Sequence, residues 1–258
     1  MYRIKTGGLI NRNKRLNFSF NGKNLVGYEG DTLSSALLGN GIHLVGRSFK
    51  YHRPRGIFSS GSEEPSALVQ LDKKNFTEPN IRATTVKLFD GLVSNSQNHV
   101  GSLSWDFMRI NDYLSTFLSA GFYYKTFMWP KAFWEKVYEP IIRNAAGLGK
   151  LSKESDPSLY DKGYLHCDLL VIGAGPAGLY SALIAARTGA KIIIVDEDFI
   201  LGGSFNGENI EINDNVCSDW AKSILSELNS LKNVRLMPST TLYGSFDHGI
   251  YGALEVKS

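Results

Sequence analysis

The clearest pattern of apolar and polar positions lies between Cys167 and Asp198, which read CDLLVIGAGPAGLYSALIAARTGAKIIIVDED. The apolar run Leu169 to Ile172 is typical of a parallel strand covered on both faces, and Lys191 to Val195 predicts a second such strand. Between them, apolar residues recur at helical spacing, namely Leu179, Leu183 and Ala186. The pattern predicts a strand, a helix and a parallel strand, the repeating unit of an α/β sheet.

A different pattern opens the chain. Leu16, Phe18 and Phe20 alternate with polar residues, Asn21-Gly22 suits a type I′ turn, and Leu25 to Tyr28 predicts the returning strand of a hairpin. A short helix is expected from Leu33 to Leu38, capped by Asp31 or Thr32 and ended by Gly41. Further strands are expected over Ala67 to Leu71 and Ile81 to Phe89. A hairpin, a helix and more strands follow the order of the β-grasp fold of plant-type ferredoxins.

Large aromatic side chains fill the stretch between these two patterns. Disordered linkers lack such residues, so we expect the stretch to pack, with burial in a core favoured over a subunit interface. Its aromatic residues are Trp105, Phe107, Phe117, Phe122, Tyr123, Tyr124, Phe127, Trp129, Phe133 and Trp134.

After Gly203 the pattern predicts a helix over Val216 to Leu231 and a third parallel strand over Val234 to Met237. A hairpin follows, with strands from Thr241 to Phe246 and from Tyr251 to Val256. A dinucleotide-binding fold normally continues to a strand on the far side of the first. We therefore expect a sheet that is incomplete at its C-terminal end, through a truncated gene, a split subunit or a partial sequence.

These patterns predict an α+β domain of the β-grasp, ferredoxin-like type over residues 1–100 and an aromatic connecting segment over residues 101–165. An α/β domain of the Rossmann type that binds FAD or NAD(P), incomplete at the C-terminus, is expected over residues 166–258.

The glycines of the first α/β unit have separate tasks. Gly173 permits the tight turn, Gly175 lets the backbone approach a pyrophosphate, and Gly178 lets the helix pack closely. Asp196 ends the second strand, where a carboxylate binds the hydroxyls of an adenosine ribose, and further acids beside it disfavour the 2′-phosphate of NADP. The predicted cofactor is NAD, with FAD as the alternative, because both share the ADP half. The predicted contacts are Gly173, Gly175, Pro176, Ala177, Gly178, Asp196, Glu197 and Gly203.

Charge and cysteine content restrict the partners. The chain has 258 residues with 28 basic and 25 acidic side chains, a net charge of +3, which does not suggest binding to nucleic acid. Cys167 and Cys217 show no pairing pattern, as expected in a reducing compartment. The N-terminus lacks the apolar stretch of a signal peptide, and no apolar run approaches a membrane helix. A cytoplasmic protein without membrane contact is expected.

A basic segment, GRSFKYHRPRG, runs from Gly46 to Gly56. Its cations Arg47, Lys50, Arg53 and Arg55 alternate with Phe49, Tyr51 and His52. Two interpretations are equally open: a patch for phosphate or an acidic partner, and a solvated loop whose arginines bind local carbonyls. His52 is a candidate acid or base, although a histidine without a visible partner is more often structural.

The loop that would hold an iron–sulfur cluster in a ferredoxin reads FSSGSEEP, Phe58 to Pro65, and contains no cysteine. Such clusters are bound by cysteine thiolates. The sequence therefore predicts no iron–sulfur cluster, and no metal ligands are assigned.

Four segments together, GDTLSSALLGNGIHLVGRSFKYHRPRGIFSSGSEEPSALVQL, AGFYYKTFMWP, GAGPAG and LYGSFDHGIYGALE, resemble the N-terminal part of the α subunit of heterotetrameric sarcosine oxidase. The resemblance implies a ferredoxin-like domain without a cluster, an NAD site at Gly173, Gly175, Gly178 and Asp196, and a folate-binding domain absent from this chain. It also implies a complex with a flavin-bearing β subunit and smaller subunits. That complex oxidises sarcosine to glycine, with tetrahydrofolate as one-carbon acceptor and hydrogen peroxide as product.

The preferred hypothesis is an NAD-binding part of such an α subunit, an oxidoreductase subunit that is not catalytic alone, with no catalytic residues assigned. Two alternatives remain open. One is an FAD-holding electron-transfer subunit of an opine or amino-acid dehydrogenase-like complex. The other is a remnant without catalysis that serves assembly.

Overall fold

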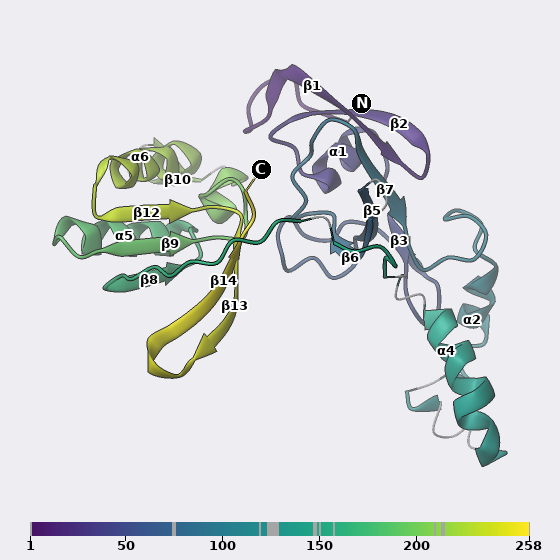
Figure 1. Cartoon of the computed structure of the whole chain (residues 1–258). Helices are drawn as coiled ribbons and strands as arrows, with labels where there is room; N and C mark the ends of the chain where they lie inside the picture. Colours follow the sequence, from purple (N-terminus) through teal and green to yellow (C-terminus); the bar gives the residue numbers. More distant parts are fainter. Residues whose placement is uncertain are drawn as a thin grey trace. The chain divides into compact units, whose positions relative to one another are not determined.

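A computed structural model describes residues 2–73, 76–118, 120–122, 129–146, 149, 151–156, 158–208, 210–212 and 215–257 (Figure 1). The chain forms two compact units. Unit 1 comprises Met1–Lys5 and Ile10–Ser158, and unit 2 comprises Thr6–Leu9 and Leu159–Ser258. The predicted boundaries at residues 100 and 165 remain predictions.

Unit 1 opens with the predicted hairpin, formed by β1 (Asn11–Phe20) and β2 (Lys23–Glu29). The two strands pair antiparallel up to Phe20 and Lys23. Asn21 and Gly22 have φ angles of 51° and 74°, as a type I′ turn requires. The inward side chains of β1 are Leu16, Phe18 and Phe20, all buried. The alternation in the sequence therefore identified this hairpin correctly.

Helix α1 (Leu33–Gly39) follows the hairpin. Thr32 is its N-cap: the Thr32 hydroxyl accepts the N–H of Ser35 at 3.1 Å, and the Ser35 hydroxyl accepts the N–H of Thr32 at 3.0 Å. This reciprocal pair satisfies two backbone donors at the helix start. Asp31, the other predicted cap, instead pairs with Arg3 and receives the Ser35 hydroxyl at 2.6 Å.

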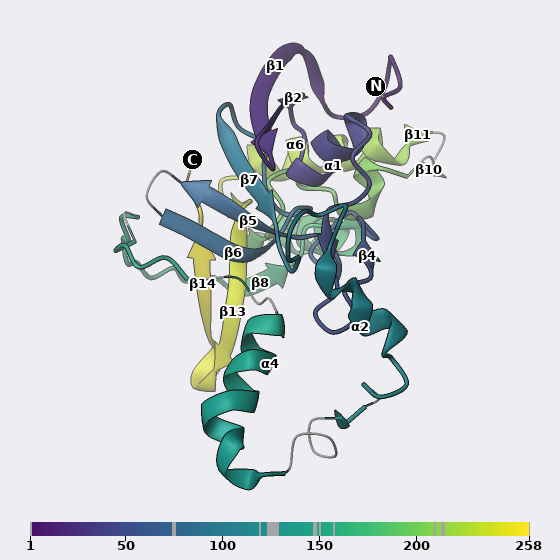
Figure 2. The same cartoon turned by 90° about the vertical axis from the view of Figure 1, so that its right-hand side faces the viewer.

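The five-stranded sheet of unit 1 has the order β2-β1-β7-β5-β6, seen in Figure 2. Strands β5 (Leu68–Lys73) and β6 (Phe76–Arg82) form a second hairpin, so the strand expected over Ile81 to Phe89 lies several residues earlier. Strand β7 (Leu92–Ser96) inserts between β1 and β5, parallel to β1.

The sequence pattern did not reveal β7, because two of its three buried positions are serines. The Ser94 hydroxyl donates to the carbonyl of Ser19 at 3.0 Å. The Ser96 hydroxyl donates to Oδ1 of Asn21, also at 3.0 Å. Buried polar groups with such partners are compatible with a core position, but they leave no apolar alternation in the sequence.

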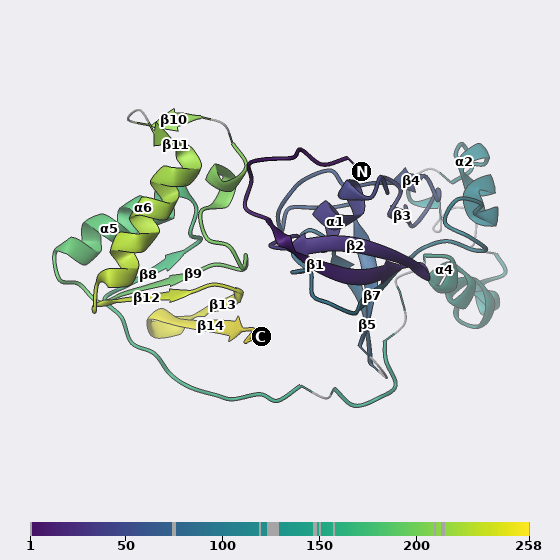
Figure 3. The same ribbon diagram turned by 90° about the horizontal axis from the view of Figure 1, so that it is seen from above.

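Unit 2 contains a three-stranded parallel sheet of order β12-β9-β8, formed by β8 (Leu169–Ile172), β9 (Ile192–Val195) and β12 (Val234–Met237). Helices α5 (Pro176–Arg187) and α6 (Cys217–Ser230) cover one face (Figure 3). Their apolar residues form one core with Ile192 and Ile194 of the central strand. The strands and helices predicted for this unit are confirmed to within one or two residues.

The hairpin β13 (Thr240–Phe246) and β14 (Ile250–Glu255) approaches the other face of this sheet. Ile193, Val195 and Met237 form a small core there with Leu242 of β13. Burial on both faces was expected for β8, but only β9 is buried along its whole length. β8 lies at the sheet edge, and Ile172 is 57% exposed.

The remaining elements are short. They are β3 (Gly46–Arg47), β4 (Pro54–Arg55), η1 (Phe107–Arg109), α2 (Ile110–Tyr113), η2 (Lys131–Phe133), η3 (Trp134–Tyr138), α4 (Glu139–Ala146), η4 (Gly203–Asn206), β10 (Glu211–Ile212), β11 (Asn215–Val216) and η5 (Asp247–Gly249). Among the helices of the described part of the chain, none has the length and apolar content needed to cross a membrane.

Among the described residues of the aromatic segment, several of the large rings lie outside any core, contrary to the favoured interpretation. Trp105, Phe107, Phe117 and Trp129 are each at least 74% exposed. Of these four residues, only Phe107 lies in a helix, and the others lie in bends and turns. Tyr123, Tyr124 and Phe127 lie outside the described residues.

Candidate nucleotide-binding site

The candidate site begins where β8 turns into α5. Gly173 has a φ of 94°, a backbone conformation that favours glycine, and its N–H donates to the carbonyl of Val195 at 2.8 Å. The chain therefore leaves the parallel sheet abruptly and directs the N-terminus of α5 toward the carboxyl ends of the strands. Ligands of open α/β sheets bind at these strand ends.

Gly175 and Gly178 have opposite surroundings. A Cβ at Gly178 would lie 1.9 Å from the carbonyl oxygen of Gly173 and 3.3 Å from Cγ1 of Val171, so the helix start touches the turn and the strand. A Cβ at Gly175 would meet no atom within 4 Å. Gly175 is the N-cap of α5, with φ −73° and ψ −177°, angles that any residue can adopt. The space beside Gly175 is open to a ligand.

The first turn of α5 supplies the donors of this open space. Pro176 occupies the first helical position, where its missing N–H costs nothing. The N–H groups of Ala177 and Gly178 lie within the first turn, where backbone N–H groups have no acceptor within the helix. Together with the helix dipole, such groups favour a phosphate.

Asp196 follows β9 and lies beside the glycine turn. Its Oδ2 accepts the N–H of Ala174 at 2.5 Å, and its Oδ1 accepts the N–H of Asp198 at 2.8 Å. The carboxylate is partly exposed and retains further lone pairs. Glu197 is exposed, and its side chain has no hydrogen-bond partner among the residues that the structure describes. The structure thus places Asp196, but not the Glu197 side chain, in contact with the glycine turn.

The Gly202-Gly203 loop closes over the same turn. The N–H of Gly202 donates to the carbonyl of Ala174 at 3.0 Å. A Cβ at Gly203 would lie 2.9 Å from Cα of Gly175, so only glycine permits this approach. Both glycines have positive φ angles, 128° and 57°. The sequence analysis named Gly203 but missed Asn206, whose side-chain amide donates to the carbonyls of Ile200 and Leu201 and holds the loop.

In unit 1, the loop from Phe58 to Pro65 closes around the carboxylate of Glu64, which is 1% exposed. This carboxylate accepts four backbone N–H groups at 2.6 to 3.0 Å, from Phe58, Ser59, Ser66 and Ala67. Burial on its own would raise the pKa of Glu64, but the four N–H donors together lower it below its usual value of 4.5. The ionised carboxylate therefore stabilises the folded loop.

We expect Glu64→Gln to lower the unfolding free energy at neutral pH by about 1–3 kcal/mol, because it removes a charge-assisted acceptor. The folded-state pKa of Glu64 lies below 4.5, so this stabilisation is complete above 4.5 and is lost as pH falls through the folded-state pKa. Urea unfolding should show a difference between the wild-type protein and Glu64→Gln that shrinks in acid. Glu63→Gln, at an exposed neighbour, is the control; a difference independent of pH would contradict the assignment.

His52 has a partner that the sequence did not show. Its Nδ1 lies 2.6 Å from Oδ2 of Asp106, 54 residues away, and the histidine is 2% exposed. Oδ1 of Asp106 accepts the N–H groups of Val100 and Met108. A pair so buried joins two segments of unit 1, and the structural interpretation of His52 is favoured over an acid or base role.

Two family descriptions match separate parts of the chain. Residues 13–99 match a 2Fe-2S iron-sulfur cluster binding domain, and residues 168–236 match FAD dependent oxidoreductase. These matches define the class: a ferredoxin-like region followed by an FAD dependent oxidoreductase region.

Curated relatives narrow this class to one type of subunit. Sarcosine oxidase subunit alpha of Rhizobium meliloti (strain 1021) is 53% identical over 254 residues, 98% of this chain and 26% of that protein. The protein of the same name from Corynebacterium sp. (strain U-96) is 33% identical over 93% of this chain and 20% of its own length. The chain is thus a homologue of sarcosine oxidase alpha subunits, as the resemblance predicted, and it spans between a fifth and about a quarter of the length of these relatives.

A solved structure has the same fold. L-proline dehydrogenase from P. horikoshii superposes with a TM-score of 0.60 and 21% identity, covering 95% of this chain and 38% of that chain. At this identity the likeness concerns the fold alone.

The comparisons correct the cofactor prediction. NAD was preferred, but the matching family is described as FAD dependent, so the prediction of NAD is wrong and the alternative, FAD, is favoured. The glycine spacing could not separate them, because both cofactors present an ADP half to this turn.

The prediction that the chain holds no iron–sulfur cluster is likewise contradicted by a family match. The family that matches residues 13–99 is described as a 2Fe-2S iron-sulfur cluster binding domain. Within residues 13–99 of this chain there is no cysteine, since Cys167 and Cys217 lie elsewhere. The residues present therefore do not supply the thiolates on which such clusters are held, and we derive no chemistry through a cluster.

Proposed function

We propose that unit 2 binds the ADP half of FAD at the turn between β8 and α5. The open space beside Gly175 carries this proposal, because a cradle without a side chain next to a helix N-terminus suits a pyrophosphate. Ala177 and Gly178 would present N–H groups to the phosphates, and Asp196 would accept the ribose hydroxyls. When bound, FAD would supply hydride or electron transfer. The chain's own contribution is to bind and orient the cofactor.

The wider role follows from the alpha-subunit relatives. We propose that the chain works as the nucleotide-binding part of an oxidoreductase complex with flavin-bearing partner subunits. Its expected reaction is the oxidative demethylation of sarcosine, with tetrahydrofolate as one-carbon acceptor and hydrogen peroxide as product. A cytoplasmic location belongs to the same proposal and is supported by the two free cysteines, of which Cys217 is buried.

The site is tested by titrating the nucleotide-free chain with FAD and following the flavin fluorescence. We expect saturable binding that Asp196→Asn weakens about 10- to 100-fold, because hydrogen bonds to a charged acceptor contribute about 1.5–3 kcal/mol. Asparagine keeps one oxygen to accept the N–H of Ala174, so the turn is retained. Glu197→Gln is the matched control, with the same loss of charge at the exposed neighbour. No binding of FAD, or equal weakening by both substitutions, would refute this site.

A further inference from the structure

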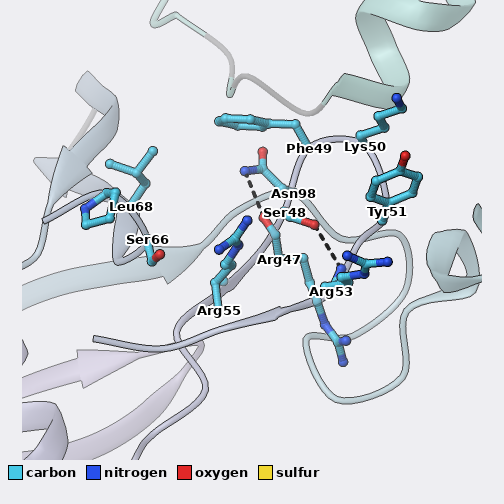
Figure 4. Close-up of a pocket in the computed structure, with 12 residues that line it drawn as sticks. Arg47, Ser48, Phe49, Lys50, Tyr51, Arg53, Arg55, Ser66, Leu68 and Asn98 are labelled. Atoms are coloured by element: carbon cyan, nitrogen blue, oxygen red, sulfur yellow. Dashed lines mark hydrogen bonds between the residues drawn. The ribbon is translucent and has the colours of Figure 1, made fainter. Parts of the chain in front are cut away.

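Unit 1 contains a cavity of about 330 Å³ in the basic segment, apart from the candidate nucleotide site (Figure 4). Strands β3 and β4 pair antiparallel, and the loop between them is closed by a hydrogen bond from the N–H of Ser48 to the carbonyl of Arg53 at 3.0 Å. Ser66, Leu68 and Asn98 complete the wall. The cavity is therefore formed by elements with defined backbone contacts.

The residues that line this cavity include four cations and no acid: Arg47, Lys50, Arg53 and Arg55. Arg53 is paired with Asp112 at 2.7 Å. Arg47 is 4% exposed, and its guanidinium donates to the carbonyls of His52, Leu103 and Ser104 rather than to a carboxylate. Among the described residues no carboxylate pairs with Arg47, and clefts lined by one sign of charge concentrate ions of the other sign.

Arg55 is the cation available to a ligand. It is exposed, and within the described ranges its guanidinium has no hydrogen-bond or ion-pair partner. Figure 4 shows this guanidinium pointing into the space between Ser66 and Asn98. A planar guanidinium presents two parallel N–H donors that match a carboxylate or a phosphate.

Asn98 narrows the choice of anion. Its Nδ2 donates to the carbonyl of Arg47 at 3.3 Å, whereas its Oδ1 is buried without a hydrogen-bond partner. A buried acceptor without a donor is unfavourable, so a ligand that brings a donor gains affinity here. A carboxylate has no donor at neutral pH, but hydrogen phosphate carries a P–OH group beside its anionic oxygens.

We propose that this cavity binds a hydrogen phosphate group, either as the free ion or as the monoanion of a phosphate monoester, which keeps its P–OH below a second pKa of about 6. Arg55 binds the anionic oxygens, and Oδ1 of Asn98 accepts the P–OH. Phe49 is 41% exposed and lies across the cavity from Arg55 in Figure 4, where it offers a surface to the organic part of an ester.

The proposal is tested by isothermal titration calorimetry of the full chain with inorganic phosphate at constant ionic strength. We expect saturable binding that Arg55→Gln weakens by at least about tenfold, the loss of one charge-assisted pair. Arg15→Gln removes the same charge from an exposed position on β1 and leaves binding unchanged. Asn98→Asp abolishes binding through repulsion; the φ of 61° at this position suits aspartate as well as asparagine.

Three results would overturn the proposal: no saturable heat with phosphate, equal weakening by both arginine substitutions, or acetate binding as tightly as phosphate. Phenyl phosphate separates the two sources of the group when both ligands are titrated below a pH of about 6, where the ester keeps its P–OH. Tighter binding than phosphate, lost in Phe49→Ala, identifies a monoester, whereas equal affinity identifies the free ion. Circular dichroism of each variant verifies that the fold is retained.

Discussion

Gly178→Ala is expected to destabilise unit 2 by about 2 kcal/mol or more. In an open helix this substitution would stabilise by up to about 1 kcal/mol, because alanine is the better helix former. Here the added Cβ would lie 1.9 Å from the carbonyl oxygen of Gly173 and 3.3 Å from Val171. Overpacking costs about 1–3 kcal/mol and sometimes more, and a backbone oxygen within the turn cannot rotate away. The clash therefore outweighs the gain in helix propensity.

Urea unfolding of the full chain, followed by circular dichroism, measures this loss. Gly207→Ala is a suitable control, because the nearest atom to its Cβ, the carbonyl oxygen of Ser204, would lie at 4.0 Å, and its φ of −120° is open to alanine. A Gly178→Ala protein as stable as the wild type would show that α5 does not approach the turn as closely as the structure places it.

The α/β unit was predictable from the sequence because each of its parts has a recognisable local sequence pattern. The apolar runs became β8 and β9, Gly189 follows the helix, and Asp196 follows β9 directly. No local sequence pattern of this kind identifies the cofactor. At the proposed site the turn and the acid would contact only the ADP half, which NAD and FAD share, so the spacing of these residues is the same for both cofactors.

Contacts between distant segments were not predictable in the same way. Strand β7 places Ser94 and Ser96 in the core. A buried strand is predicted from alternating apolar residues, and these serines interrupt that pattern. Asp106 contacts His52 from 54 residues away, and the sequence around either residue does not predict this pair. The exposure of the aromatic segment was missed for a related reason. Large apolar residues indicate that a surface is to be covered, but the sequence alone does not say whether the chain itself or a partner covers it.

Gly175→Asp is expected to weaken cofactor binding while the stability of unit 2 is kept, whereas Gly178→Ala is expected to lower that stability. Gly175 is the N-cap of α5, a position that aspartate favours, and a negative charge there is stabilised by the helix dipole. The backbone angles at Gly175 suit any residue, and its Cβ would meet no protein atom within 4 Å. We therefore expect the unfolding free energy to stay equal or rise by up to about 1 kcal/mol.

Binding of FAD to Gly175→Asp, by contrast, is expected to fall at least about 100-fold, because a carboxylate would occupy the space proposed for the pyrophosphate and repel it. Gly175→Asn caps the helix with a neutral side chain of similar size, so it distinguishes lost volume from repulsion. If volume alone matters, both substitutions weaken binding equally, whereas repulsion makes the aspartate variant weaker and its defect sensitive to salt. A Gly175→Asp protein that folds and binds FAD like the wild type would exclude this turn as the phosphate site.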